Sequence, residues 1–190
     1  MPRDMKLVKP IMGCTAFAAL GMLAVACAVD GSADEEEPAG VSQSAEELSS
    51  FSCSEHQATA YINDNPSTIN VVTVDGHAVR KITANAYYEM AKAAQKDGVQ
   101  IRIVSGFRTM AEQKYLYHCY TSCSCNGCNL AAKPGYSNHQ SGHALDLNTS
   151  APGVYHWLEN HAAHYGFKRT VPSEAWHWEW WGGGPGGGPC

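Results

Sequence analysis

The chain has 190 residues, of which 44% are hydrophobic and 16% charged, and its formal net charge at pH 7 is −5. From residue 51 onward, 10 Lys and Arg balance 10 Asp and Glu, so the acidic excess lies before that position. A balanced domain gives no sign of the basic patch that a polyanion requires, and this argues against nucleic acid as a partner. Residues 51–190 are long enough for one domain with one core.

The first 26 residues have the pattern of a secretory signal peptide. Arg3, Lys6 and Lys9 form a basic start, and an uninterrupted apolar run follows up to Cys27. This run is too short, with the wrong flanks, for a membrane span of about 20 residues. Its last residues, AVAC, resemble a lipoprotein box that would place a lipid anchor on Cys27, although residues 24–26 also suit ordinary signal peptidase. Both alternatives predict export.

Composition divides the rest of the chain into three parts. Residues 27–50 contain seven acidic residues, no basic ones and no aromatics, which predicts a disordered tether. Residues 51–181 carry the folded domain. The last residues, 182–190, are rich in Gly and Pro and are expected to be a flexible tail with no packing role of its own.

Within the domain, strand and helix patterns follow one another without regular alternation, which predicts an α+β fold. A hairpin is expected around Asp75–Gly76, and Thr109 with Glu112 forms a capping box that begins a helix ending near His118. The expected elements are a hairpin over 67–82, a helix over 83–98, a strand over 99–105, a helix over 109–118, a strand over 143–148, a helix over 152–166 and a strand over 174–181.

Six cysteines follow Cys27, and in an exported chain six cysteines predict three disulfides. Cys53 and Cys190 lie at opposite ends of the domain, and a bond between them would tie its termini together. The other four lie in 119–128 and could instead form a structural zinc site, but CSCNGC lacks the paired arms of a zinc ribbon.

A metal site is indicated by three residues. In the strand ALDL, alternation points Asp146 away from the two leucines, and in WHWEWW it points His177 away from three tryptophans that are expected in the core. With His139, these residues would supply two nitrogens and one oxygen, the composition of an open catalytic zinc site. His143 is a weaker alternative ligand, because three ligands are already placed.

Hydrolysis at such a site also needs a base and a fixed cation. Glu174, three residues before His177, is the candidate base. Glu179 is an alternative base, but its position favours a supporting contact or a salt bridge. Arg108, in the turn SGFR, is placed to stabilise charge on a carbonyl oxygen.

The segment AKPGYSNHQSGHALDLN resembles the signature A-x-P-G-x-S-x-H-x-x-G-x-A-x-D of the VanY-type D-alanyl-D-alanine carboxypeptidase family. The family's E-x-W-H motif is matched at residues 174–177, and its arginine motif is matched by SGFRTMAEQ at residues 105–113. The resemblance implies the LAS-type zinc peptidase fold, with a small central antiparallel sheet flanked by helices. It further implies one zinc ion per chain on His139, Asp146 and His177, Glu174 as general base, and substrate contacts from Arg108, Gln113 and Ser137.

This chain departs from the family pattern in two places. One is the cysteine-rich insertion at 119–128, which could line the cleft, and the other is the glycine tail. The resemblance implies an enzyme acting on peptidoglycan stem peptides, with release of terminal D-alanine as the first expectation, and the protein is expected to be a monomer. An endopeptidase with the same zinc chemistry is the alternative. A wall-binding module that keeps zinc but lacks catalysis is a third possibility, and Glu174 argues against it because a binder needs no base.

Overall fold

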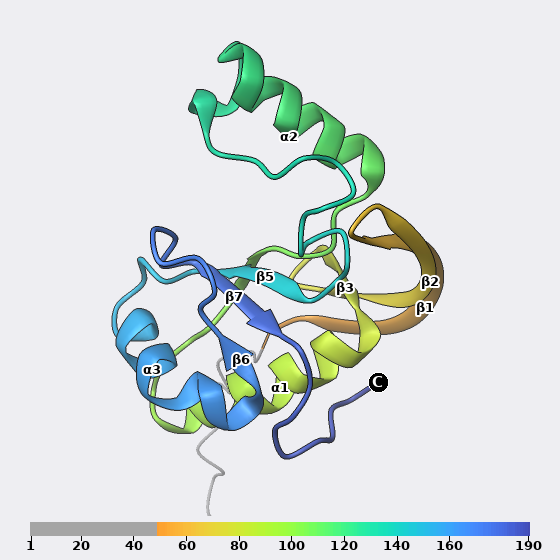
Figure 1. Cartoon of the computed structure of the whole chain (residues 1–190). Coiled ribbons are helices and arrows are strands. Elements are labelled where there is room, and N and C mark those ends of the chain that lie inside the picture. Colours follow the sequence, from red (N-terminus) through yellow and green to blue (C-terminus); the bar gives the residue numbers. More distant parts are fainter. Residues whose placement is uncertain (1–48) are drawn as a thin grey trace, which may run out of the picture. The chain divides into compact units, whose positions relative to one another are not determined.

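The computed structural model describes residues 49–190, and the predicted signal peptide, Cys27 and nearly all of the acidic tether lie outside the described residues. The described part has the predicted α+β fold (Figure 1). Its strands form two antiparallel sheets, one in the order β1-β2-β3 and one in the order β4-β5-β7-β6. The elements in chain order are β1 (Phe51–Ile62), β2 (Asn65–Val74), β3 (His77–Arg80), α1 (Lys81–Lys96), β4 (Ile103–Ser105), α2 (Met110–Ser122), η1 (Asn126–Cys128), β5 (Ala144–Leu147), α3 (Val154–His161), η2 (Ala162–Tyr165), β6 (Phe167–Lys168) and β7 (His177–Trp180).

The first sheet contains the predicted hairpin and one strand that the sequence did not indicate. β2 and β3 pair through the Asp75–Gly76 turn, so the predicted hairpin is confirmed. Before them, β1 pairs with β2 through a two-residue turn in which Asn63 and Asp64 have φ of 50° and 65°. Two successive positive φ values define a type I′ turn, which matches the twist of the strands. β1 lacked a sequence signal because Ala60 alone among its residues is buried.

The main core lies between the four-stranded sheet and the helices α1 and α3. Leu145 and Leu147 of β5 are buried in it together with Trp178 of β7. From the helices, the large residues Tyr87, Met90 and Trp157 pack into the same cluster. Since strand residues alternate between faces, the residues between these core positions point to the other face of the sheet. That face carries the polar side chains discussed below.

The predicted helices are present, but two of them end differently from the prediction. The helix expected to end near His118 continues to Ser122 as α2. The strand expected over 99–105 is also shorter, since only Ile103–Ser105 form β4. The Thr109–Glu112 capping box begins α2 as predicted. The helix expected over 152–166 is instead α3 followed by the 3₁₀ turn η2, which ends at Gly166 with φ of 82°. A side chain at Gly166 would meet the Gly182 carbonyl oxygen at 2.7 Å, so this position requires glycine. No helix within residues 49–190 has the length and apolar character needed to cross a bilayer.

The expectation that the glycine tail has no packing role is wrong. The tail runs back along α1, where the Cys190 amide donates to Asn85 Oδ1 at 3.0 Å. A Cβ on Gly188 would come within 2.4 Å of the Asn85 side chain, and one on Gly184 within 2.7 Å of the Tyr165 carbonyl oxygen. Glycine is therefore used here for close contact between backbone and helix rather than for freedom of movement.

All six cysteines of the described chain are paired. Cys53–Cys190 links β1 to the end of the tail, as the sequence suggested, across 137 residues. Cys119–Cys125 and Cys123–Cys128 close short loops at the end of α2. The three predicted disulfides are therefore present, and the alternative zinc site at 119–128 is not, because its ligands are bonded to one another.

The prediction for the three tryptophans holds for only part of the set. Trp178 is 4% exposed and Trp180 packs against the core, but Trp176 is 48% exposed. β7 begins at His177, so Trp176 precedes the strand and does not follow its alternation.

Candidate metal centre

The three predicted metal ligands come together on the polar face of the four-stranded sheet. Asp146 in β5 and His177 in β7 are directly paired across the two strands. His139 lies in the 137–142 segment, a turn closed by the hydrogen bond from the Gly142 amide to the His139 carbonyl oxygen at 3.2 Å. All three side chains are buried or nearly so, and among the described residues they are the one group with metal-ligating atoms close enough to share an ion.

The distances between their ligand atoms fit a tetrahedral ion. Asp146 Oδ1 lies 3.2 Å from His139 Nε2 and 3.2 Å from His177 Nδ1. The two nitrogens are 3.3 Å apart. Ligands about 2.0–2.1 Å from a tetrahedral zinc ion are separated from one another by about 3.3 Å. The chain thus presents one face of the required tetrahedron and leaves its fourth corner open.

Hydrogen bonds on the outer side of each imidazole fix which nitrogen faces the centre. His139 Nδ1 donates to the Gly106 carbonyl oxygen at 2.8 Å. His177 Nε2 donates to Glu179 Oε1 at 2.9 Å. Because a carbonyl or carboxylate oxygen accepts, each ring carries its proton on the outside and directs a lone pair inward. Two lone pairs and one carboxylate oxygen converging in a buried space call for a cation.

The ionisation of the group agrees with this geometry. Burial raises the pKa of Asp146, but hydrogen bonds from His139 and His177, with the charge of Arg108, hold it well below its usual range. Burial lowers the pKa of His177, yet its bonds to Asp146 and Glu179 raise it to about 9. The two carboxylates thus place negative charge on both sides of His177, and this favours a cation at the centre.

Glu174, the predicted base, lies beside the ligands without belonging to them. Its Oε2 is 3.8 Å from His177 Nδ1, and its side chain is 23% exposed. The Glu174 carbonyl oxygen accepts from the His177 amide at 3.3 Å, so the turn before β7 holds base and ligand together. A carboxylate at this distance, open to solvent on one side, can exchange protons with a molecule bound at the fourth corner.

Arg108 lies at the centre but contacts a ligand. Its Nη2 donates to Asp146 Oδ2 at 2.9 Å and to Ser105 Oγ at 3.2 Å. The carboxylate of Asp146 therefore has one oxygen toward the histidines and one toward the guanidinium. This contact orients the ligand, which the sequence did not predict.

Two predicted substrate contacts occupy interior positions. Gln113 is fully buried, and its Nε2 donates to the Ala132 carbonyl oxygen at 2.8 Å, while its Oε1 has no hydrogen-bond partner within residues 49–190. Ser137 is 6% exposed, and its Oγ accepts from the His139 amide at 3.3 Å. Gln113 therefore fixes the backbone at Ala132, and Ser137 fixes the start of the 137–142 segment, which we call the metal loop.

Glu179 and His143, the two alternatives, both support the centre from outside. Glu179 accepts from His177, from Asn138 Nδ2 at 2.8 Å and from Trp181 Nε1 at 2.7 Å. Burial raises the pKa of Glu179, but these hydrogen bonds lower it to about 2. His143 lies against Trp181, with ring centroids 3.9 Å apart, and bonds Arg80 rather than the metal ligands. Asn138 and Trp181 are supporting residues that the sequence analysis missed, since nothing in their spacing indicates the contact.

The contact from Glu179 leads to a prediction. Glu179→Gln keeps an acceptor for His177 Nε2 but removes the negative charge that makes the ring a better ligand. We expect zinc affinity to fall by about tenfold, at the lower end of the 10–100-fold range for such partners. Competition with a fluorescent chelator measures this, with Glu159→Gln on the exposed side of α3 as the control. Equal affinities in the two variants would contradict it.

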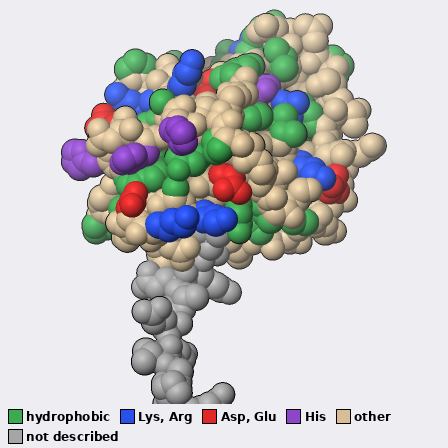
Figure 2. All heavy atoms as spheres, turned by 90° about the horizontal axis from the view of Figure 1, so that it is seen from below, with side chains coloured by type: hydrophobic (Ala, Val, Ile, Leu, Met, Phe, Trp, Pro, Cys, Tyr) green, Lys and Arg blue, Asp and Glu red, His purple; other side chains and the backbone are tan. Residues whose placement is uncertain are grey.

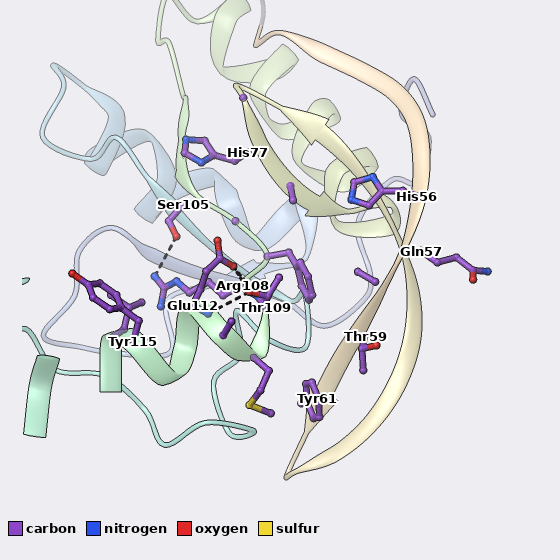
Figure 3. Close-up of a pocket in the computed structure, with 18 residues that line it drawn as sticks. His56, Gln57, Thr59, Tyr61, His77, Ser105, Arg108, Thr109, Glu112 and Tyr115 are labelled. Carbon is purple, nitrogen blue, oxygen red and sulfur yellow. Dashed lines mark hydrogen bonds between the residues drawn. The ribbon is translucent and has the colours of Figure 1, made fainter. Parts of the chain in front are cut away.

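A large cavity adjoins the centre. It has a volume of about 1040 Å³ and lies between β1 and the segment 105–116 (Figure 3). Ser105 and Arg108 belong both to its wall and to the hydrogen bonds around Asp146. The cysteine-rich segment 119–128 contributes nothing to this wall. The last residue of α2 that lines the cavity is Leu116. The expectation that the insertion lines the cleft is therefore not met for this cavity.

The face of the domain seen in Figure 2 carries charged side chains of both signs. Lys, Arg, Asp, Glu and His side chains are interspersed on it, with no extended area of one charge. The histidines of α3 and η2, at positions 156, 161 and 164, are exposed and take no part in the metal centre.

The fold and the centre define a class: small α+β proteins with an open site for one metal ion and a carboxylate beside it. The family model described as VanY, D-alanyl-D-alanine carboxypeptidase, matches residues 76–183, and the chain belongs to this family. The resemblance noted in its motifs is thereby confirmed.

Two curated relatives are D-alanyl-D-alanine carboxypeptidases. The protein of Enterococcus faecalis is 30% identical over 120 residues, which are 50% of this chain and 45% of the relative. The protein of Enterococcus faecium is 34% identical over 100 residues, 50% of this chain and 31% of the relative. This chain thus spans less than half the length of either relative.

Among solved structures, the chain is similar to VanYB in complex with D-alanine-D-alanine. The TM-score is 0.54 at 23% identity, over 65% of this chain and 85% of that one. At this level of identity the likeness concerns the fold, and it confirms the predicted architecture.

Proposed function

We propose that this protein is a zinc-dependent metallopeptidase that releases terminal D-alanine from peptidoglycan stem peptides. The observation that carries the proposal is the convergence of His139, Asp146 and His177 with Glu174 placed beside them. Membership of the VanY family supports the substrate class. Three protein ligands of this composition with a free fourth position are typical of catalytic zinc.

When bound, zinc would polarise the scissile carbonyl and lower the pKa of water. The chain's own residues do the rest. Glu174 takes a proton from the attacking water and delivers it to the leaving amine, which needs a carboxylate that is close to the ligands and free of them. Arg108 holds Asp146 through Nη2 and offers its remaining donors to the carbonyl or terminal carboxylate of the peptide. Ser137 keeps the metal loop in position, and Gln113 holds the backbone at Ala132.

The proposal is tested by incubating the oxidised, zinc-loaded protein with a stem pentapeptide ending in D-Ala-D-Ala, and separately with cross-linked muropeptides. Mass spectrometry identifies the products. Loss of one D-alanine from the pentapeptide is the expected result. Cleavage of the cross-links alone would establish the endopeptidase, which the size of the adjoining cavity makes the second candidate. Zinc binding without products from either substrate would point to a wall-binding module.

We also propose that the protein is exported as a monomer and anchored through a lipid on Cys27. The basic and apolar start of the chain, the acidic segment after it and the three disulfides support an oxidising location. The mass of the mature N-terminus separates the two processing routes, because a lipidated Cys27 carries added acyl mass and ordinary cleavage does not.

A further inference from the structure

The cavity beside the metal centre is bounded by the edge of a strand. Its wall includes the consecutive β1 residues 56–59 together with Tyr61. Successive residues of a strand point to opposite faces, so a cavity against one face would contact every second residue. Contact with consecutive residues therefore places the backbone of β1 in the wall, and Gly76, His77 and Ala78 add to the wall from the β2–β3 turn and β3. β1 is an outer strand of its sheet, and this edge has no partner strand in the described chain.

The hairpin register shows which backbone groups of β1 point away from β2, toward the free edge. Ile62 and Asn65 flank the two-residue turn, and such a closing pair exchanges both backbone hydrogen bonds. Counting back along β1, every second residue turns its N–H and C=O toward β2, and the residues between them turn theirs outward. Gln57, Thr59 and Tyr61 are the outward set. Pro66, which cannot donate, faces Tyr61 in the non-bonded pair, as this register requires.

The outward amide of Tyr61 already has a hydrogen-bond partner, which lies in the metal loop. The Tyr61 amide donates to the Gln140 carbonyl oxygen at 2.9 Å, next to His139 in the chain. The outward backbone groups of Gln57 and Thr59 have no hydrogen-bond partner within residues 49–190. The free edge therefore begins where the metal loop ends and continues away from it.

The opposite wall of the cavity comes from the first turns of α2. Ala111, Glu112 and Tyr115 line it, and Figure 3 shows Tyr115 and Glu112 across from Tyr61 and Thr59. A volume of about 1040 Å³ lies just above the ~300–1,000 Å³ range for small-molecule sites, so the cavity has room for more than one amino-acid residue. β1 also precedes residue 76, where the match to the family begins.

We propose that the free edge of β1 binds the acyl-side residues of the peptide substrate as an added strand, through the backbone groups of Gln57 and Thr59. Strand addition is a general way to bind an extended peptide, with main-chain hydrogen bonds supplying affinity. The inference rests on the proposed function and adds to it a preference for peptides that extend several residues before the scissile bond. A substrate reaching only to the metal gains nothing from this edge.

The test compares a short substrate, N-acetyl-D-Ala-D-Ala, with the stem pentapeptide, using the zinc-loaded full protein. The quantity measured is the ratio of kcat/KM for the long substrate to that for the short one. Ala111→Trp fills the cavity from an exposed position, and Lys114→Trp adds the same ring at an exposed position of α2 that does not line the cavity. We expect Ala111→Trp to lower the ratio by about tenfold, as for the loss of two or three hydrogen bonds, and Lys114→Trp to leave it unchanged.

A second pair of variants separates the backbone from the side chain. Thr59→Pro removes the outward N–H without breaking the ladder to β2, a position where an edge strand accepts proline. Thr59→Val keeps the N–H. The proline variant is expected to lower the ratio and the valine variant to preserve it, with circular dichroism confirming that both fold.

Failure of the inference is distinct from failure of the proposed function. If the wild type hydrolyses both substrates and neither Ala111→Trp nor Thr59→Pro changes the ratio, the edge is not a substrate site. If the wild type hydrolyses neither, the proposed function fails, and calorimetric binding of the pentapeptide decides the inference. Weaker binding by Ala111→Trp than by Lys114→Trp would then support it, and equal or absent binding would overturn it.

Discussion

Glu174→Gln is expected to lower kcat for release of D-alanine by at least about 100-fold, while zinc remains bound at one ion per chain. An amide of the same shape cannot take the proton from the attacking water, and general base catalysis contributes about 10²–10⁴-fold. The metal is retained because Glu174 Oε2 lies 3.8 Å from His177 Nδ1 and is outside the ligand triangle. Single-turnover hydrolysis of the pentapeptide and elemental analysis of the purified protein measure the two quantities.

The matched control is Glu89→Gln, which makes the same chemical change on α1, away from the metal ligands. It should retain both activity and zinc. A Glu174→Gln variant with near wild-type kcat would remove Glu174 from the reaction and return attention to Glu179. A variant that loses zinc would show instead that Glu174 is a ligand.

Asp146→Asn is expected to reduce zinc affinity by at least about 100-fold and to abolish detectable hydrolysis without zinc in excess. Asn keeps the volume, and its oxygen can still accept from Arg108 Nη2, which now donates to Asp146 Oδ2 at 2.9 Å. Its amide nitrogen, however, would face the inward lone pairs of His139 and His177 and cannot bind a metal. The variant should therefore fold but lack one of three ligands.

Zinc titration against a chelator and far-ultraviolet circular dichroism test both parts of this expectation. Asp97→Asn is the control. Asp97 accepts a hydrogen bond from Trp157 Nε1 at 2.7 Å on the far side of the core, and the side-chain oxygen of an asparagine can accept the same bond. Full zinc affinity in Asp146→Asn would show that the three residues do not form the metal site.

The structure and the sequence agree best where a local rule is strong. The Asp75–Gly76 hairpin, the Thr109–Glu112 capping box and the alternation of ALDL each depend on neighbours within a few residues, and each is present. β1 was missed because its residues form an exposed, twisted ribbon held by pairing with β2, with no buried stripe to mark it.

The surroundings of the metal centre could not be read from the sequence, because they depend on contacts between distant segments. The bond between Arg108 and Asp146 joins residues 38 positions apart, and the bond between Asn138 and Glu179 joins residues 41 apart. The packing of the glycine tail on α1 is of the same kind, since composition alone indicates flexibility, whereas the Cys53–Cys190 bond and the hydrogen bond to Asn85 join the tail to distant segments.

By itself, the sequence determined the family, the α+β class and the candidate ligands, because ordered motifs and short-range periodicity record the chemistry that a site needs. The tertiary structure alone decided which atoms of His139, Asp146 and His177 face one another and that Gln113 turns inward. It also decided that the edge of β1 lies open beside the metal loop. The physical reason is that orientation and access are set by packing among segments far apart in the chain, which no local pattern encodes.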